Sequence, residues 1–339
     1  MNGRRAVRIA GSAFIAALAI GFGRPWVALA IHAASYPVTG SGETANVVID
    51  GETVFASRAE RGIDVIDAVS GKVVRTLAPP LGSESVDDLA IANGLLFALD
   101  ARTPGHLSVF SLDDLSLASP PVDVAVGPFS GVSAGGGRVL VSGGTSQMSL
   151  RSYDSSGQLS PVLATIDLGR GQPDVLLAPD GTRAFVSTHD WGPYFGVTTV
   201  RVDAASLTRA SVLPLDTYGF TNGGAKPVSF PLETALANDV LLIADLDGLT
   251  IVSTETARPL AQLNVGVEAV NVDASNGLAA VVGSSPRPLL VLVNITSPAH
   301  PRVVRSIPLR GQPTGVAIGA THIAVATQQH GVLLINHQP

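Results

Sequence analysis

The 339-residue chain contains no cysteine, and this absence excludes disulfide bridges, thiolate metal sites and a cysteine nucleophile. Charged residues are scarce as well, at 14% of the chain, against about 25% in an average soluble domain. Aromatic residues make up 5%, and no apolar stripe with a helical period is sustained over a long stretch. The core is therefore expected to consist of small aliphatic side chains on elements other than long helices.

Basic residues are few outside the first 30 positions. Four of the 21 basic residues belong to those positions, which leaves 17 basic against 27 acidic residues and a net charge near −10 for the rest. An acidic chain without a basic run argues against binding to nucleic acid and to anionic membrane surfaces. Turn-forming residues are abundant, with 36 glycines and 23 prolines. This composition favours many short strands.

The first 30 residues have the pattern of a secretory signal. A basic start, MNGRRAVR, precedes an apolar run from Ile9 to Gly23, and Ala28-Leu29-Ala30 provides a small-x-small pattern for cleavage. The run stops at Arg24, short of the ~20 apolar residues that span a bilayer. We expect residues 1–30 to be a signal peptide and the mature protein to be extracytoplasmic, either periplasmic or secreted. An uncleaved membrane anchor and a twin-arginine signal are the alternatives.

A tight turn followed by a short apolar strand recurs seven times in the rest of the chain. The turns are Asp50-Gly51, Asn93-Gly94, Gly136-Gly137, Asp180-Gly181, Asn238-Asp239, Asn276-Gly277 and Gly319-Ala320. Most of these pairs adopt positive φ easily, as a two-residue hairpin turn requires. Aligned positions in the strands that follow lie 38 to 57 residues apart, and they are Phe55, Phe97, Leu140, Phe185, Leu242, Ala280 and Ala324. A period of about 40–45 residues with four strand signals per unit is typical of a β-propeller blade.

The seventh unit lacks a fourth strand, which would leave a strand edge exposed. Residues 35–51 align with residues 306–320, so the segment from His32 to Thr39 is expected to supply the missing strand. The sequence therefore predicts an all-β protein in which residues 31–339 form a single seven-bladed β-propeller of four-stranded blades, closed by the N-terminal strand. We expect it to be a monomer.

Two repeats carry a family resemblance. The segment GIDVIDAVSGKVVRTL (62–77) resembles the repeat of YVTN-type propellers, and LLVLVNITSPAHPRVVRSIPLRG (289–311) resembles the LVIVD repeat, with Asn294 where that repeat has an aspartate. The resemblance covers about residues 31–339 and implies a bacterial-type extracytoplasmic propeller. It implies little about activity, because the relatives include proteins of unknown role, sugar-lactone hydrolases and subunits of amine-oxidising complexes.

The face with the loops between the second and third strands of each blade is the expected binding face, because variable loops on a rigid scaffold carry function. The candidate residues on this face are Asp100, Arg102, His106, His189, Asp190, Trp191, Tyr194, Tyr218, Asp245 and His330. The fourth blade stands out because two insertions, 188–196 and 216–226, are rich in aromatic residues. Acidic residues near the starts of innermost strands are expected to make this end of the central channel negative, and they are Glu43, Asp88, Asp174, Glu233 and Glu268.

No short-spaced ligand pair points to a metal on this face. His106, His189 and His330 come from three blades, and Asp245 with Asp247 is a weak match to an acidic calcium turn. No haem-attachment or other cofactor motif is present. We therefore expect neither a metal nor a cofactor.

Evidence for catalysis is equally sparse. The chain has no Gly-x-Ser-x-Gly elbow, and Ser142 and Ser187 are expected to be ordinary strand residues. The leading hypothesis is a binding or scaffold propeller with a protein or small-molecule partner. A sugar-lactone hydrolase, using Glu268 or Asp100 as its base, and an accessory subunit of a periplasmic redox complex are the alternatives.

Overall fold

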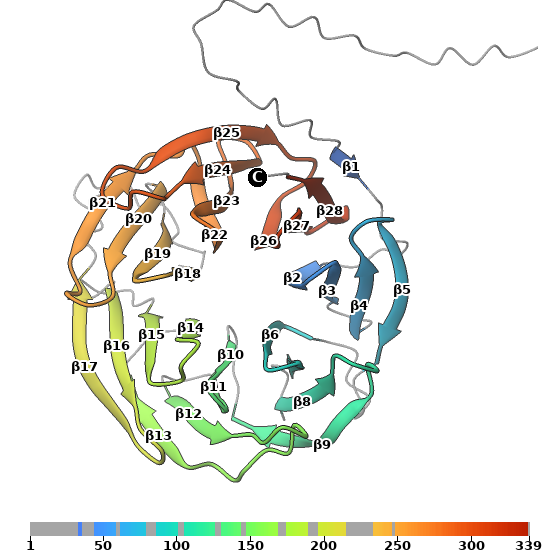
Figure 1. Ribbon diagram of the computed structural model, residues 1–339, viewed down its shortest axis with the longest axis vertical. Helices are drawn as coiled ribbons and strands as arrows, with labels where there is room; N and C mark the ends of the chain where they lie inside the picture. Colours follow the sequence, from blue (N-terminus) through green and yellow to red (C-terminus); the bar gives the residue numbers. More distant parts are fainter. Residues whose placement is uncertain are drawn as a thin grey trace, which may run out of the picture.

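The structure is a computed structural model, and it describes residues 33–35, 44–58, 62–78, 86–100, 105–125, 130–143, 147–168, 174–188, 196–214, 233–245 and 248–337. Within these residues the chain forms seven four-stranded antiparallel sheets arranged around a common axis (Figure 1). The fold is therefore the predicted seven-bladed β-propeller. In the same residues there is no helix that is long and apolar enough to cross a membrane.

The first four blades follow chain order from the innermost to the outermost strand. Blade one is β2 (Thr44–Asp50), β3 (Thr53–Arg58), β4 (Gly62–Asp67) and β5 (Lys72–Leu77). Blade two is β6 (Asp88–Ala92), β7 (Leu95–Asp100), β8 (Gly105–Ser111) and β9 (Leu117–Val124). Blade three is β10 (Val132–Gly135), β11 (Arg138–Gly143), β12 (Gln147–Ser152) and β13 (Ala164–Asp167). Blade four is β14 (Asp174–Leu177), β15 (Arg183–Thr188), β16 (Gly196–Val202) and β17 (Leu207–Pro214).

Blades five and six repeat this order, whereas blade seven takes its outermost strand from the N-terminal segment. Blade five is β18 (Thr234–Ala237), β19 (Val240–Asp245), β20 (Gly248–Ser253) and β21 (Pro259–Leu263). Blade six is β22 (Glu268–Ser275), β23 (Leu278–Ser285), β24 (Leu289–Asn294) and β25 (Arg302–Pro308). Blade seven is β26 (Pro313–Ile318), β27 (His322–Thr327), β28 (Gly331–Asn336) and β1 (Ala33–Ser35).

Ring closure follows the prediction. The short strand β1 pairs antiparallel with β28, and Ala33, Ala34 and Ser35 lie opposite Ile335, Leu334 and Leu333. The N-terminal segment thus supplies the fourth strand of the last blade and covers the middle of an edge that would otherwise be open.

Six of the seven innermost hairpins close through at least one residue with positive φ, and the exception is the hairpin of blade seven at Gly319-Ala320. Asn93 and Gly94 have φ values of 53° and 74°, as a two-residue turn of the predicted kind requires. Blade four differs, because Ala178 donates its N–H to the carbonyl of Arg183 across a wider turn. That turn packs against Gly136, where a Cβ atom would lie 2.3 Å from the carbonyl oxygen of Asp180. Glycine at 136 therefore provides both the backbone conformation and the close approach of blades three and four.

The hydrophobic core is divided into seven clusters, one at each interface between neighbouring blades. Blades five and six share the largest, with 16 buried apolar residues. Among the described residues, blades four and five share the smallest, which consists of Phe185, Val197, Leu241, Ile243 and Val252. Because burial of apolar surface is the main favourable term, the described apolar contacts contribute least to the adhesion of blades four and five.

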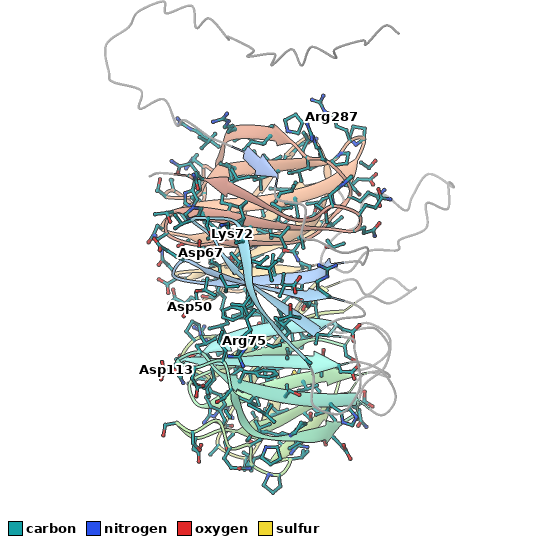
Figure 2. The ribbon with its side chains drawn as sticks, turned by 90° about the vertical axis from the view of Figure 1, so that its right-hand side faces the viewer. Asp50, Asp67, Lys72, Arg75, Asp113 and Arg287 are labelled. Atoms are coloured by element: carbon teal, nitrogen blue, oxygen red, sulfur yellow. The ribbon has the colours of Figure 1, made fainter. Side chains whose placement is uncertain are left out.

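Outermost strands in five blades carry a β-bulge at equivalent positions. The pairing register skips one residue in each, and the skipped residues are Val74 in β5, Ala118 in β9, Ala210 in β17, Leu260 in β21 and Val304 in β25. Val74, Leu260 and Val304 are 63%, 40% and 61% exposed. Lys72 and Arg75 flank the bulge of β5 on the rim of the ring (Figure 2). Bulges and basic residues both discourage pairing of a free sheet edge with another chain.

Blade one contains a buried ion pair close to the loop face. Arg58, at the end of β3, is 2% exposed, and its Nη1 lies 2.9 Å from Oδ2 of Asp64 on β4. The other oxygen of this carboxylate accepts a hydrogen bond from the hydroxyl of Thr76 on β5. Arg58 is thus held inside the blade.

Candidate functional site

One position of the innermost strand, repeated in every blade, forms what we term the axial ring. Each aligned position of the repeat, such as Phe55, pairs with one residue of the innermost strand, and the ring member is found two residues before that partner. In blade one, Phe55 pairs with Val48, and the ring member is therefore Asn46. Its seven members are Asn46, Asp88, Gly131, Asp174, Glu233, Asn271 and Gly315. All of them lie near the starts of the innermost strands, which surround the axis in Figure 1.

Asp88 shows what the axial ring does for the fold. Its Oδ2 accepts the N–H of Val132 in the next blade at 2.7 Å, and its Oδ1 accepts the N–H of Leu89. The side-chain amide of Asn46, from the preceding blade, also donates to Asp88. An innermost strand is a sheet edge, so its N–H groups need partners from outside the sheet, and the carboxylate provides them.

Asn271 and Asp273 repeat this arrangement between blades six and seven. Asn271 Oδ1 accepts the N–H of Val316, and Asp273 Oδ2 accepts the N–H of Ile318 at 2.8 Å. Burial raises the pKa of Asp273 to about 6, although the N–H groups of Ile318 and Ala274, which donate to its carboxylate, act to lower that pKa. The inner polar side chains therefore connect blades as well as lining the axis.

Asp174 and Glu233 form a carboxyl–carboxylate pair between blades four and five. The Asp174 carboxylate accepts backbone N–H groups of Val175 and Thr234, and it also accepts the proton of the Glu233 carboxyl group. Burial and the charge of Asp88 raise the pKa of Asp174 to about 7. The pKa of Glu233 lies well above its usual value, because of burial and the charges of Asp174 and Asp88. These directions favour an arrangement in which Glu233 is the protonated member of the pair and donates to Asp174.

Glycine at the third ring position brings the acids of blades two and four together. A Cβ atom on Gly131 would lie 3.5 Å from Oδ2 of Asp88 and 3.5 Å from Oδ1 of Asp174. The hydroxyl of Ser142 lies beside them and accepts the N–H of Gly131 at 2.8 Å. Three of the five predicted acids, Asp88, Asp174 and Glu233, thus lie together, whereas Glu268 is found at the start of β22 and Glu43 lies outside the described residues. Because the pKa values of these three acids are raised, they carry less charge than the number of carboxyl groups would indicate.

The charge on this cluster makes stability depend on pH. The folded-state pKa of Asp174 lies above its usual value of 3.8, so the folded state binds the proton more tightly and loses stability as the pH rises from about 4 through about 7. We expect Asp174→Asn to be more stable than the wild type by about 1–2 kcal/mol at about pH 8, and nearly equal to it at about pH 5. Urea denaturation at both pH values measures the difference.

The matched control for this prediction is Glu255→Gln, which removes an exposed acid from a turn at the opposite end of blade five. It should leave the difference in stability between the two pH values unchanged. An Asp174→Asn variant that is less stable than the wild type at about pH 8 would show that the carboxylate stabilises the interface as a charge.

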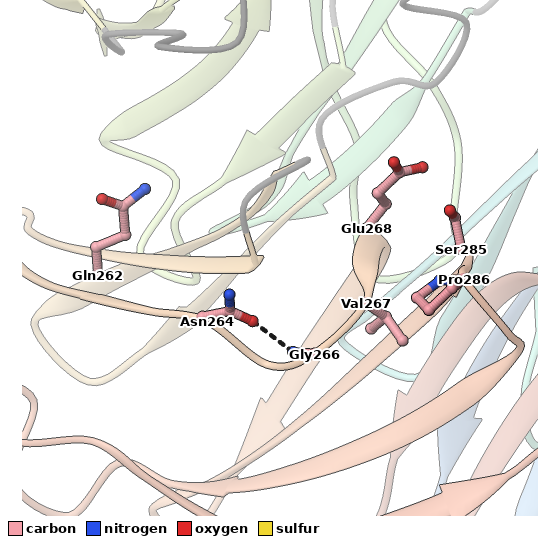
Figure 3. Close-up of a pocket in the computed structure, with 7 residues that line it drawn as sticks. All are labelled: Gln262, Asn264, Gly266, Val267, Glu268, Ser285 and Pro286. Carbon is pink, nitrogen blue, oxygen red and sulfur yellow. Dashed lines mark hydrogen bonds between the residues drawn. The ribbon is translucent and has the colours of Figure 1, made fainter.

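A pocket of ≈580 Å³ opens between blades five and six, near the starts of the innermost strands (Figure 3). It is lined by side chains that include Gln262 on β21, Asn264 in the connection between the blades, Glu268 at the start of β22, and Ser285 at the end of β23. Glu268 and Ser285 lie directly opposite each other in the strand pairing. Asn264 Oδ1 accepts the N–H of Gly266 at 2.7 Å, which fixes the orientation of the amide.

Four of the ten predicted site residues belong to the described part of the chain. Asp100 is only 3% exposed and lies opposite His106 in the pairing of β7 and β8. His106 Nδ1 in turn lies 3.1 Å from Oδ1 of Asp123 on the neighbouring strand. His106 therefore faces an acidic partner within blade two, and Asp100 is buried in the same blade.

Asp245 and His330 also have local partners. Asp245 Oδ2 accepts the hydroxyl of Thr250 at 2.6 Å, which ties the end of β19 to β20. His330 is exposed, donates its N–H to Thr327 Oγ1, and lies against Gly311. The remaining predicted residues lie outside the described part of the chain, so their roles stay predictions; they are Arg102, His189, Asp190, Trp191, Tyr194 and Tyr218.

The described residues contain no group of three His, Cys, Asp or Glu side chains arranged to hold a metal ion. What the structure does bring together is Asp88, Asp174 and Glu233, which the sequence placed near the starts of innermost strands. Glu43, predicted with them, lies outside the described residues. Asn46 and the pocket residues Gln262 and Ser285 were missed, although the alignment of the repeats places Asn46 at the same position as Asp88.

Comparisons with known proteins agree on the fold. No protein-family model matches the chain, and no curated protein matches it. Among solved structures, the chain is similar to the RRP9 WD40 repeats, with a TM-score of 0.67 and 12% identity over 91% of this chain and 97% of that chain. It is similar to U3-55K as well, with a TM-score of 0.66 and 12% identity over 90% and 98% of the two chains.

Identities this low show a shared architecture and no more. In total 1370 solved chains match, so the likeness does not select one function among the many that propellers perform. The resemblance to LVIVD and YVTN repeats stays a prediction. The function has to be argued from the axial ring and the pocket.

Proposed function

We propose that this protein is an exported interaction propeller that docks a basic segment of a protein partner on the face formed by the axial ring and the adjoining pocket. The observation that carries the proposal is the gathering of three acids from different blades, since Asp88 and Asp174 lie beside Gly131 and Glu233 is hydrogen-bonded to Asp174. Acidic groups concentrated in one place on a rigid scaffold create a local negative potential, which attracts positively charged partners.

Binding fits the axial ring better than catalysis does. Asp88 and Asp174 already accept hydrogen bonds from main-chain N–H groups of the following blade. A side chain fixed in this way is held at one orientation, which suits recognition, whereas a general base needs a lone pair directed at a substrate. The proton shared by Asp174 and Glu233 also lets the cluster gain negative charge when a cation approaches, because a neighbouring cation lowers the pKa of both groups.

Affinity capture tests the proposal. The mature chain, immobilised and exposed to the extracytoplasmic fraction of its own source, should retain a basic protein in low-salt buffer and release it at about 0.5 M salt, where screening shortens the range of charge interactions to a few ångströms. A variant that combines Asp88→Asn, Asp174→Asn and Glu233→Gln keeps side chains of similar shape but cannot ionise. It should capture at least about tenfold less of that protein, because the attraction is electrostatic.

Glu255→Gln provides the control, since it removes one acid from the opposite face, and it should capture as much partner as the wild type. Equal capture by the neutral-ring variant would overturn the proposal, and so would an acidic partner or recovery of the protein only from the cytoplasm.

A further inference from the structure

We propose that the outer rim of blade six is a docking surface for a membrane that contains anionic lipids. This surface, which we term the basic rim, consists of Arg287, Arg302, Val303, Val304, Arg305 and Arg310. It belongs to the perimeter of the ring, where β25 lies in Figure 1, and not to the axial ring. The proposal therefore goes beyond the proposed function and does not depend on it.

The outermost strand of blade six is exposed along most of its length. Five consecutive residues of β25, from Arg302 to Ser306, are exposed, and Val303 and Val304 are 43% and 61% exposed. Single exposed apolar side chains are ordinary on a protein surface, whereas two adjacent valines between two arginines form an amphipathic stripe. Such a stripe can place its apolar side chains at the boundary of headgroups and acyl chains, while the arginines stay among the headgroups.

Arginines extend over the whole height of this rim. Arg302 begins β25, Arg305 lies in its middle, and Arg310 follows its end. Figure 2 shows Arg287, from the connection between β23 and β24, at the outer edge of the same blade. All four side chains are exposed. Each basic residue that comes close to an anionic membrane strengthens binding about fivefold, so four together suffice for reversible attachment.

The third turn of blade six lacks the acid that its counterparts contain. Turns between the third and fourth strands carry an acid in each of the first five blades, and these acids are Asp67, Asp114, Asp154, Asp203 and Glu255. Blade six has Asn294 there, and its Oδ1 accepts the N–H of Thr296 at 3.0 Å, as Asp154 Oδ1 accepts the N–H of Ser156. The amide thus preserves the turn without adding a negative charge beside the arginines.

The remaining acids of blade six lie at its inner end. Glu268 and Asp273 both belong to β22, the innermost strand, and residues 264–311 contain no other acid. Charges are screened over about 10 Å at 0.1 M salt, so the basic rim acts largely through its own charges. The net negative charge of the chain, which argues against anionic membranes, is therefore compatible with local attachment at this rim.

The N-terminal segment joins the ring next to the basic rim. Figure 1 shows β1 on the perimeter between β25 and β5. The chain before β1 contains the apolar run from Ile9 to Gly23, and no acid precedes Glu43. A chain inserted in a membrane through this run would bring blades six and seven close to the lipid. This connection favours a lipid surface over an acidic protein as the occupant.

Vesicle sedimentation tests the proposal with the mature chain, which begins at Ile31 and lacks the apolar run. Vesicles of phosphatidylcholine with about 30% phosphatidylglycerol should sediment the protein at about 0.05 M salt, and about 0.5 M salt should abolish the binding. Vesicles of phosphatidylcholine alone should not sediment it. Absence of binding to the anionic vesicles overturns the proposal.

A matched pair of double variants locates the surface. Arg302→Gln/Arg310→Gln should bind the anionic vesicles at least about tenfold more weakly than the wild type. Arg201→Gln/Arg209→Gln removes the same charge from exposed positions of blade four, and it should bind like the wild type. Equal weakening in the two variants would overturn the proposal, because it would show that only the net charge matters.

Tryptophan reporters provide a second measurement on variants that keep every charge. The emission of Val304→Trp should shift to the blue when anionic vesicles are added, because the ring enters the membrane interface. Val212→Trp is the control, since Val212 is 54% exposed on β17 of blade four, and its emission should not shift. The wild type, whose mature chain contains only Trp191, gives the baseline.

Two further results would contradict the proposal. One is an unshifted emission of Val304→Trp in the presence of anionic vesicles. The other is tighter binding of soluble polyglutamate than of the vesicles, which would make the basic rim a surface for an acidic macromolecule. Capture of a basic protein through the axial ring is scored separately, so failure of the vesicle experiments leaves the proposed function intact, and failure of the capture leaves the membrane surface intact.

Discussion

A chain that begins at Gly42 is expected to lose at least about 3 kcal/mol of stability relative to one that begins at Ile31, and to aggregate. The shorter chain lacks β1, so β28 becomes a free edge. The exposed fractions of Leu334 and Ile335 on β28 are 4% and 1% with β1 in place, and both residues lie directly opposite it. Urea denaturation and light scattering measure the two effects.

The control for this truncation is a synthetic peptide of residues 31–41 added to the shorter chain. The peptide should restore part of the lost stability in a concentration-dependent way, because a ligand of the folded state shifts the folding equilibrium. If the shorter chain is as stable as the longer one, β1 contributes nothing measurable to the stability of the ring, although it pairs with β28.

Asp64→Ala is expected to destabilise blade one by about 3–5 kcal/mol, because it leaves the guanidinium of Arg58 without its carboxylate partner in a buried site. Both side chains of this pair are more than nine-tenths buried, and the distance between their charged atoms is 2.9 Å. Removing one charge therefore costs more than removing a surface ion pair would. Chemical denaturation of the single variant measures the loss.

The double variant Arg58→Met/Asp64→Leu is the matched control, since it replaces the pair with apolar side chains of comparable size. It should recover to within about 1 kcal/mol of the wild type, because a buried ion pair and an apolar pair often contribute similarly to stability. A double variant as unstable as Asp64→Ala would show that the shape of the site matters more than the uncompensated charge.

The fold could be predicted because its determinants are local and repeated. Turn pairs such as Asn93-Gly94 mark each hairpin, and aligned positions such as Phe55 and Phe97 pair with equivalent residues of the innermost strands. Closure could be predicted as well, because the missing strand had one matching segment elsewhere in the chain. Blade four was less regular, since its wide turn depends on the approach of Gly136 from blade three.

The site could be predicted only in part. Counting strand starts placed Asp88, Asp174 and Glu233 together, because every blade begins at the same end of the ring. Their protonation could not be predicted, since it depends on burial and on distances between blades. The pocket escaped prediction because Gln262 and Ser285 come from different strands of two blades and share no motif. Arg58 ends β3 and is buried, because its partner Asp64 lies inside the sheet, and nothing in the local sequence indicates this pairing.

The axial ring has one further consequence, which concerns orientation. Seven similar blades give the scaffold an approximate sevenfold rotational symmetry, so its shape alone would accept a partner in seven nearly equivalent poses. The ring members break that symmetry, because acids occupy blades two, four and five while Gly131 and Gly315 leave two positions without a side chain. A ligand that is centred on the axis therefore has a single preferred angular setting. Exchanging the residues at positions 88 and 271 would rotate that setting without altering the blades themselves.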